Sequence, residues 1–187
     1  MNTAPDPADP ADSAESRLTR ETSGRVVPMW DGDGPEPQWL DDAEIRAWRN
    51  LMLSHENLVS VLDRELRRAH GLTLQEYEVF VRLAERPDRT MRMADLADSL
   101  AVSRSRLTHV VAKMEKNGWV ERVSSLDDRR GVDCRMTAAG WDAHVAAVPE
   151  HVNGVRRHLI DLLDETEIAV LGRAFAKVNA HLEGETR

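Results

Sequence analysis

The sequence contains a single cysteine, Cys134, among 187 residues. One cysteine excludes an internal disulfide framework and a cysteine-rich zinc site, because both need at least one more thiol. No apolar run approaches the roughly 20 residues that span a bilayer. The first residues also lack the basic start and apolar run of a signal peptide. We therefore expect a cytoplasmic protein that has no membrane partner.

Motifs of the common enzyme classes are absent as well. The sequence has no glycine-rich phosphate loop, no HExxH pair and no nucleophile elbow. Carboxylates and histidines are plentiful, but they fall on predicted exposed helical faces, and no spacing demands a convergent polar pocket. We expect a protein that is not an enzyme and that holds no metal and no cofactor.

Charge is distributed unevenly along the chain, which has a formal net charge of −8. Residues 1–41 hold nine acidic and three basic residues, a net charge of −6, so the remainder carries only about −2. The first segment is rich in Pro, Asp, Ala and Ser, a composition that cannot bury enough apolar surface to offset its ordering entropy. We predict that residues 1–38 form a disordered acidic tail. Trp30 in this tail and Trp39 just after it have rings that suit local docking.

A helical pattern begins at Asp41. Apolar residues recur there at spacings of three and four, which is typical of an amphipathic helix, and Gly71 suits its C-terminal end. The stripe consists of Trp48, Leu51, Met52, His55, Leu58, Val59, Leu62 and Leu66. Thr73 and Glu76 then have the spacing of a capping box, which predicts a second helix. A short third helix is predicted over the sequence MADLADSL.

A fourth helix is predicted from Ser103, its N-cap, to about Asn117, and its two faces differ. The apolar face consists of Leu107, Val110, Val111 and Met114. No acidic residue occurs between Ser103 and Lys113. The other face carries Arg104, Ser105, Thr108, His109 and Lys113, with Arg106 near its flank. Two helices joined by a tight turn, the second bearing bases and hydroxyls, suit base and phosphate contacts in a major groove. A solvated basic face is the alternative for this helix taken alone.

The segment after Gly118 predicts a hairpin. WVERVSS and GVDCRMT read as two short strands around the turn LDDRR, which is the pattern of a wing attached to the fourth helix. Arg129 and Arg130 at the tip suit a minor groove, whose negative potential attracts guanidinium groups. Asp128 lies two positions from Arg130, on the same side of an extended chain, and is placed to orient it. An ordinary charged turn is the alternative.

These segments resemble the MarR (multiple antibiotic resistance regulator) family of winged-helix transcription factors. The resemblance rests on RMADLADSLAVSRSRLTHVVAKMEKNGWVER, DDRRGV and RMTAAG, and in helix order it spans roughly residues 42–183. It implies that Ser103 to Lys113 belong to the major-groove helix, and that Arg130 with Asp128 is the wing arginine with its acidic support. It also implies dimerisation through the N- and C-terminal helices, and a small aromatic or anionic effector bound between the DNA-binding and dimer regions.

The last third of the chain carries a long apolar seam. Its members step by four and three, a spacing suited to packing against another helix: Trp141, Val145, Val148, Val152, Val155, Leu159 and Leu162. Pro149 lies inside the seam and predicts a kink or break near Val148. Asp164 with Glu167 predicts the start of a final helix. Its apolar face consists of Ile168, Leu171, Phe175, Val178 and Leu182. These stripes exceed what a small winged helix needs for its own core, so we predict a homodimer.

The predicted fold is mainly α with a small β-hairpin wing: a winged helix-turn-helix with N- and C-terminal dimerisation helices. After the tail over 1–38 come a dimerisation helix over 39–70, the winged helix-turn-helix over 72–138 and the C-terminal dimerisation helices over 139–183. The function implied is a sequence-specific, ligand-responsive repressor that binds a palindromic operator in double-stranded DNA. A twofold dimer reads two half-sites about one helical turn apart.

Several residues have two readings. His144, His151 and His158 are spaced by seven residues, and one metal cannot hold two of them because seven residues of helix rise about 10.5 Å. We expect solvated histidines at the rim of the seam, with a pH-sensitive or cross-dimer cluster as the alternative. Cys134 is expected to be a structural thiol. The effector pocket is predicted between the first two helices, and plain core is the alternative for each of its residues: Trp48, Met52, His55, Tyr77 and Phe80.

Two other functions remain open at this point. A winged helix can bind proteins without sequence-specific DNA binding, and the acidic tail resembles nucleic acid in charge. A thiol-based redox sensor is the other alternative. Binding to random DNA at low salt that weakens steeply with added salt separates a DNA-binding protein from the protein-binding module.

Overall fold

The computed structural model describes residues 35, 37–124 and 131–185. Residues 1–45 and 46–187 form two units, each described by itself. Most of the predicted acidic tail, Trp30 included, lies outside the described residues. In the first unit Asp41 caps the start of α2 (Asp42–His70), since its Oδ1 accepts the N–H groups of Ala43 and Glu44 at 2.7 and 2.9 Å.

The helix-turn-helix consists of three helices: α3 (Leu74–Ala84), α4 (Met93–Ser99) and α5 (Arg104–Lys116). The capping box predicted for α3 is confirmed, because Thr73 Oγ1 accepts the Glu76 N–H and Glu76 Oε2 accepts the Thr73 N–H. Ser103 caps α5 as predicted, its Oγ accepting the Arg106 N–H at 3.2 Å. Local hydrogen bonds thus fix where both helices begin.

The turn between α4 and α5 depends on one unusual backbone conformation. Ala101 has a φ of 51°, in the left-handed region, where a side chain costs about 1–2 kcal/mol. The Val102 N–H closes the turn on the Ala97 carbonyl at 3.1 Å. The tight turn brings α5 directly against the helices before it.

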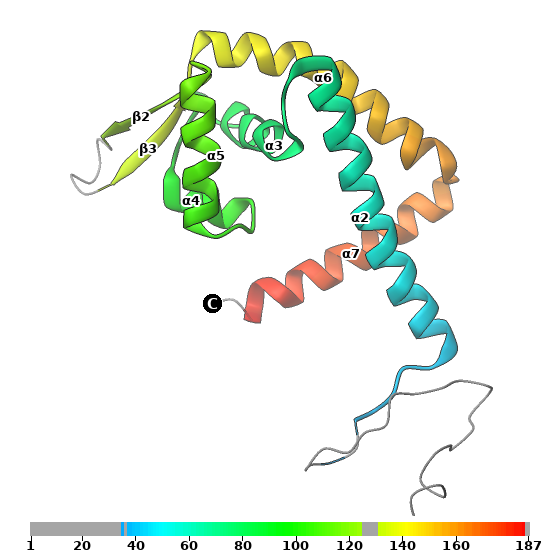
Figure 1. The fold of residues 1–187 in the computed structure, drawn as a ribbon. Coiled ribbons are helices and arrows are strands. Elements are labelled where there is room, and N and C mark those ends of the chain that lie inside the picture. The colour runs from blue at the N-terminus through cyan, green and yellow to red at the C-terminus, as the bar shows by residue number, and fades with distance from the viewer. Residues whose placement is uncertain (1–34, 36, 125–130, 186–187) are drawn as a thin grey trace, which may run out of the picture. The chain divides into compact units, whose positions relative to one another are not determined.

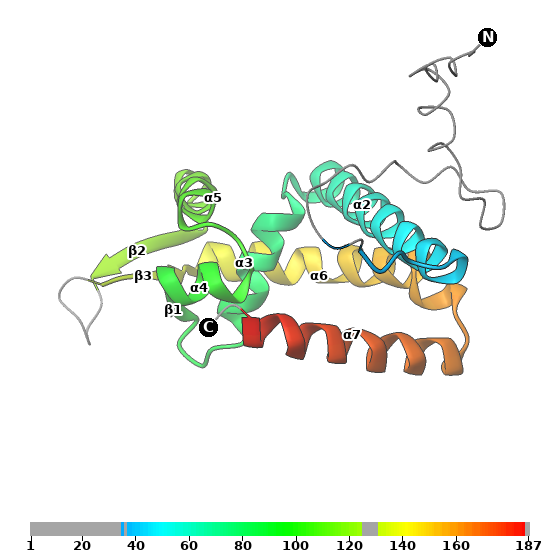
Figure 2. The same cartoon turned by 90° about the horizontal axis from the view of Figure 1, so that it is seen from below.

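Three short strands form an antiparallel sheet in the order β1-β3-β2. The strands are β1 (Thr90–Arg92), β2 (Val120–Ser124) and β3 (Val132–Met136). The β2–β3 hairpin was predicted and lies beside α5 (Figures 1 and 2). β1 was not predicted, because three residues are too few to show alternation. The predicted wing tip, with Asp128, Arg129 and Arg130, lies outside the described residues.

The core lies between the helix-turn-helix, the sheet and the adjoining parts of α2 and α6 (Ala138–His158). Its largest fully buried side chains include Phe80, Leu66, Leu83, Leu96, Leu107 and Met114. The predicted apolar face of α5 is confirmed, since Leu107, Val111 and Met114 are each 0% exposed. The stripe of α2 divides: Leu62 and Leu66 are buried, whereas Trp48 and Met52 remain 55% and 40% exposed.

The start of α6 approaches the sheet closely at a glycine. Thr137 caps α6 by accepting the Gly140 N–H at 3.0 Å, and its hydroxyl donates to the Gly118 carbonyl at 2.7 Å. A Cβ at Gly140 would lie only 2.0 Å from the Trp119 carbonyl oxygen. Only a residue without a side chain fits there unless the backbone shifts.

α6 continues through Pro149 as one helix. Of the kink or break predicted near Val148, the break is therefore wrong, and the kink stays a prediction. Proline has no N–H, so Pro149 leaves the Val145 carbonyl without its helical hydrogen bond. Both residues are exposed, and water can hydrogen-bond to this carbonyl instead. Further along, Gly154 lets α6 approach α2, because a Cβ there would lie 2.8 Å from Leu62 Cδ2. His158 and Arg157 both contact Glu65 Oε1 of α2, at 2.9 and 3.0 Å.

The chain ends in η1 (Ile160–Leu162) and α7 (Glu165–Glu185), which runs back in the direction opposite to α6 (Figure 2). Asp164 caps α7 as predicted, its Oδ1 accepting the Glu167 N–H at 2.8 Å. No residue from Glu165 to Gly184 is buried, and only Leu171 and Phe175 are half-buried. The described helices are all too short or too polar to cross a bilayer.

We expect Gly140→Ala to lower stability by about 3 kcal/mol, because the new methyl group forces the first turn of α6 away from the sheet. Thermal unfolding followed by circular dichroism measures the loss. Gly184→Ala is the matched control, since nothing lies within 4 Å of its Cβ position, and it should leave the midpoint unchanged. An unchanged midpoint for Gly140→Ala would contradict the close approach.

Candidate nucleic-acid interface

The polar face of α5 is exposed over its whole length. Burial of its apolar stripe turns the predicted DNA-binding side chains outward, and all of the following are exposed: Ser103, Arg104, Ser105, Arg106, Thr108, His109 and Lys113. With no acid among them, the face presents only cationic and hydroxyl or imidazole groups. The structure therefore brings the helix residues predicted from the sequence together on one surface.

Ser103 Oγ and Ser105 Oγ lie 3.2 Å apart, and three more of these side chains have partners elsewhere in the chain. Thr108 Oγ1 donates to the Arg104 carbonyl at 2.8 Å, and Arg106 Nε donates to Gln75 Oε1 at 3.2 Å. Lys113 Nζ lies 2.9 Å from Glu76 Oε1. The contacts of Thr108 and Arg106 are with neutral groups and are exposed, so they compete only weakly with binding to DNA. The contact of Lys113 is different, because its partner is a buried carboxylate.

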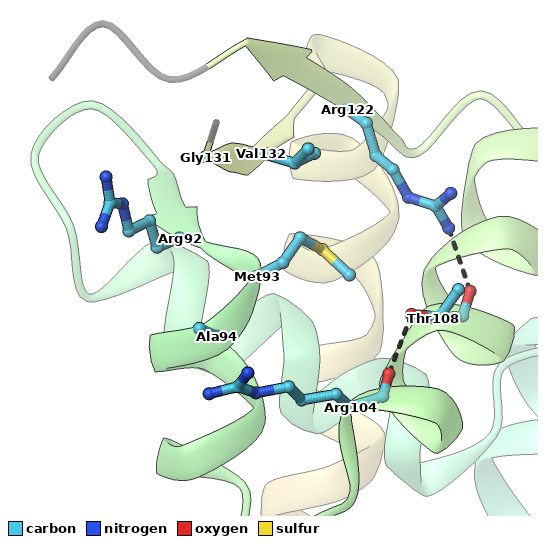
Figure 3. A pocket seen from close by; sticks show the side chains of 8 residues that line it. All are labelled: Arg92, Met93, Ala94, Arg104, Thr108, Arg122, Gly131 and Val132. Carbon is cyan, nitrogen blue, oxygen red and sulfur yellow. Dashed lines mark hydrogen bonds between the residues drawn. The ribbon is translucent and has the colours of Figure 1, made fainter. Parts of the chain in front are cut away.

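A hollow of about 400 Å³ lies between the N-terminal ends of α4 and α5 and the wing strands (Figure 3). Its lining includes Arg92, Arg104, Arg122, Thr108 and Val132. In Figure 3 the guanidinium groups of Arg92 and Arg104 extend along one side, whereas Arg122 points toward Thr108. Three guanidinium groups around one depression favour an anionic occupant such as a backbone phosphate.

Arg122 also joins the wing to α5. Its Nη2 donates to the Thr108 carbonyl at 3.0 Å and lies 3.5 Å from Glu115 Oε2. Its own N–H donates to Glu115 Oε1 at 3.0 Å. Part of its charge is thus balanced within the chain, and its clearest role is to hold β2 against α5.

Sequence reasoning did not single out Arg92 or Arg122. Arg122 stands in the predicted strand WVERVSS, where alternation gave no sign that its side chain turns toward α5. Arg92 belongs to β1, the strand that was not predicted. The available signal was position alone: both residues adjoin predicted helix-turn-helix or wing elements.

The residues predicted as an effector pocket do not gather around one cavity. Tyr77 and Phe80 are 4% and 0% exposed and face α6, where Tyr77 stacks on His151 with ring centroids 4.3 Å apart. Trp48, Met52 and His55 are exposed on α2. The effector pocket therefore stays a proposal for these residues, and neither of the two hollows found among the described residues is lined by both groups.

The prediction of solvated rim histidines is wrong for His144 and His151. His144 is 8% exposed and its ring lies 5.6 Å from that of Tyr77. Burial lowers the pKa of both His144 and His151 below the usual value, so both imidazoles are neutral near pH 7. His158 is half-buried and bound to Glu65. The seam residues alone gave no sign that α3 would cover this side of α6.

A second hollow, of about 310 Å³, adjoins these histidines. Tyr77, Glu78, Val81, Arg82, Ser99, Leu100, Ala101 and His151 line it. Arg82 Nε and His151 Nδ1 are buried and have no hydrogen-bond partner in the described part of the chain. Burial raises the pKa of Glu78. The hollow thus combines aromatic and apolar walls with unsatisfied polar atoms, as ligand pockets do.

Cys134 is 0% exposed in the middle of β3. Burial, and to a lesser degree the charge of Glu115, raises the pKa of its thiol to about 12. A buried thiol with so high a pKa is a poor nucleophile, because the thiolate is the reactive form. The structural reading of Cys134 therefore fits better than the redox alternative.

The described elements define a winged helix-turn-helix protein: three helices with a tight turn, a sheet whose hairpin adjoins the last of them, and an exposed cationic face. Long helices precede and follow this unit. None of the described residues forms a cluster that would hold a metal ion.

Comparison with known proteins also indicates a winged helix-turn-helix regulator. The MarR family profile matches residues 72–132. The regulator PecS of Dickeya dadantii is 26% identical over 162 residues, which are 84% of this chain and 92% of PecS. The crystal structure of AbsC, a MarR family regulator from Streptomyces coelicolor, is 37% identical with a TM-score of 0.75, over 79% of this chain and 99% of AbsC. Sco3205 from the same organism, solved with DNA, is 37% identical with a TM-score of 0.76, over 80% and 93%.

The chain belongs to the MarR family of transcriptional regulators. The resemblance stated from the sequence is confirmed, and so is the predicted fold class.

We expect Cys134 to resist alkylation in the folded protein. At pH 8 a thiol with a pKa of about 12 is ionised to about one part in ten thousand, against about a quarter at an ordinary pKa near 8.5. Mass spectrometry after iodoacetamide treatment should show no adduct over an hour in buffer and a complete one within minutes in urea. Rapid modification of the folded protein would restore the redox-sensor alternative.

Proposed function

We propose that the protein is a homodimer that binds a palindromic operator in double-stranded DNA and represses transcription until a small effector binds. The observation that carries this proposal is the exposed surface of α5 beside the wing strands, which contains no acidic residue from Ser103 to Lys113. The related Sco3205, solved in complex with DNA, supports DNA as the ligand. Repression is the simpler outcome, because a protein that occupies a promoter hinders transcription without contacting the polymerase.

In this proposal α5 enters the major groove. Arg104 lies in its first turn, where side chains of a recognition helix reach base edges, and an arginine suits bidentate contact with guanine. Arg106 would leave only the neutral Gln75, a hydrogen bond with a net contribution of about 1 kcal/mol. Thr108 and His109 follow along the same exposed face. Ser103 and Ser105, whose hydroxyl oxygens are 3.2 Å apart at the helix start, suit phosphate.

The wing is proposed to reach the adjacent minor groove. Arg130 would enter it, oriented by Asp128, and Arg129 would contact phosphate at its edge. These residues lie outside the described part of the chain, so this step rests on the sequence and the family resemblance. The arginine-lined hollow between α4, α5 and the wing would take the phosphate between the two grooves.

Dimerisation is proposed through residues 39–70 and 139–183, on either side of a DNA-binding region over 72–138. Exposed apolar side chains support it on both sides: Trp48, Leu51, Met52, Val145, Val152, Ile168, Val170, Val178 and Leu182. A 21-residue helix such as α7, with no buried residue described, has little to hold it in place in a single chain. A second copy would cover these faces and make two half-sites available.

The effector is proposed to be a small aromatic or anionic molecule bound in the second hollow. Tyr77 and His151 offer ring faces there, and the unpaired Arg82 Nε offers a donor. The hollow also touches Ala101 in the turn of the helix-turn-helix. A ligand would alter DNA binding only by favouring one spacing of the two DNA-reading lobes over another.

We expect Arg104→Ala to weaken operator binding by about 1–3 kcal/mol and to relax base preference at one position in each half-site. The operator comes from selection of bound sequences out of random duplex DNA, and fluorescence anisotropy measures the affinity. Arg68→Ala removes the same charge from the exposed end of α2 and should keep the preference. Failure of the unaltered protein to bind any duplex at low salt would favour the protein-binding module instead.

We expect Val178→Glu to break the dimer while leaving the protomer folded. Val178 is 48% exposed in the single chain, so a carboxylate there costs the protomer little. In a twofold interface each substitution occurs twice, and we expect the dissociation constant to rise at least about 100-fold, or about 2.7 kcal/mol. Sedimentation equilibrium measures it. Asn179→Glu adds the same charge one position away, and equal effects of the two variants would contradict the proposed face.

A further inference from the structure

The carboxylate of Glu76 is the most deeply buried acidic group in the described core. Glu76 is 1% exposed and stands in the first turn of α3. Its Oε2 accepts the Thr73 N–H at 2.8 Å and so closes the capping box. Its Oε1 accepts no hydrogen bond from the described residues. A buried carboxylate with one oxygen unsatisfied needs a compensating charge close by.

Lys113 of α5 supplies that charge. Its Nζ lies 2.9 Å from Glu76 Oε1, and its side chain is 52% exposed. The contact is short but is not aligned as a hydrogen bond, so the attraction is mainly that of two opposite charges. The lysine stem therefore bends back across the recognition helix toward α3 rather than extending outward.

Asp63 of α2 joins the same group of charges. Its Oδ1 accepts the Leu74 N–H at the start of α3, and its Oδ2 pairs with Arg67. Burial raises the pKa of Asp63, but the hydrogen bonds from Arg67 and Leu74 and the charges of Arg67 and Lys113 outweigh it and hold the pKa below its usual value. Lys113 thus contacts Glu76 of α3 directly and acts on Asp63 of α2 through its charge.

A phosphate would have to compete with this buried partner. If Lys113 turned to DNA, the buried Glu76 carboxylate would lose its ion-pair partner and keep the Thr73 N–H and the more distant charge of Arg67. Breaking a buried pair by removing one partner costs more than the pair itself contributes. Lys116, the other lysine of α5, has no ion pair among the described residues and is under no such constraint.

We propose that Lys113 is a positioning residue: it ties the recognition helix to Glu76 and to the α2–α3 junction rather than contacting DNA. This inference rests on the proposed DNA binding by α5 and changes the role that the sequence predicted for Lys113. The pose of α5 then depends on α2, the helix proposed to hold the dimer. Movement of α2 at the dimer interface would reach the DNA-reading face through this charge group.

The test measures operator affinity against salt for Lys113→Met, Glu76→Gln and the double variant. We expect each single change to weaken binding about tenfold, the double variant to bind no worse than either single one, and the salt slope to stay unchanged. Lys113→Arg should restore most of the affinity. Glu85→Gln, which removes an exposed carboxylate at the other end of α3, should bind as well as the unaltered protein or better.

Glu76→Gln is the decisive variant, because long-range electrostatics and loss of the Lys113 contact predict opposite changes in DNA affinity. Removing a negative charge near DNA should tighten binding, whereas loss of the tie should weaken it. The amide still accepts the Thr73 N–H, so this variant serves even if a Lys113 variant does not fold. Tighter binding by Glu76→Gln, or a slope lowered by about one unit per half-site in Lys113→Met, overturns the inference. Absence of DNA binding by the unaltered protein would instead overturn the proposed function.

Discussion

Burial of one side of α5 is the constraint on which the interface depends. Leu107, Val111 and Met114 are each 0% exposed, and full burial of side chains of this size contributes about 1.5–3 kcal/mol apiece. With these three fixed in the core, the rotation of the helix about its own axis is fixed too, and the residues between them must face solvent. The arginines do not set their own direction. Their apolar neighbours set it, and the wing strand held by Arg122 then closes one side of the surface.

The chain exposes two surfaces of opposite character. The face of α5 is polar and cationic, so it is stable in water and needs no partner in order to fold. The face of α7 is different, because Val178 and Leu182 remain 48% and 53% exposed on a helix in which no described residue is buried. Isolated helices of this length are marginal in water. The proposed dimer would cover the apolar face of α7, whereas the proposed DNA contact would use the polar face of α5.

The sequence predicted the features that depend on neighbours three or four residues apart. The capping boxes at Thr73 and Asp164 and the apolar stripe of α5 are of this kind, and the structure confirms them. Features that depend on tertiary packing were missed: β1, the covering of His144 by α3, and the ion pair between Lys113 and Glu76. An apolar seam marks which side of a helix is buried but not by what. A basic residue on a recognition helix likewise does not reveal an acidic partner from another helix.

α3 connects the parts of the protein that regulation would have to link. Tyr77 packs on His144 and His151 of α6. Glu76 contacts Lys113 of α5. Tyr77 and Glu76 both lie in the first turn of α3. The second hollow opens against the same helix and the turn that follows α4. A ligand in this hollow would contact both the proposed dimerisation helix α6 and the helix-turn-helix. A change in the spacing of these two parts would therefore change the contacts of the ligand. That differential contact is what linkage requires. A long chain of intermediate residues is unnecessary, because one short helix, α3, lines the second hollow and contacts both α6 and α5.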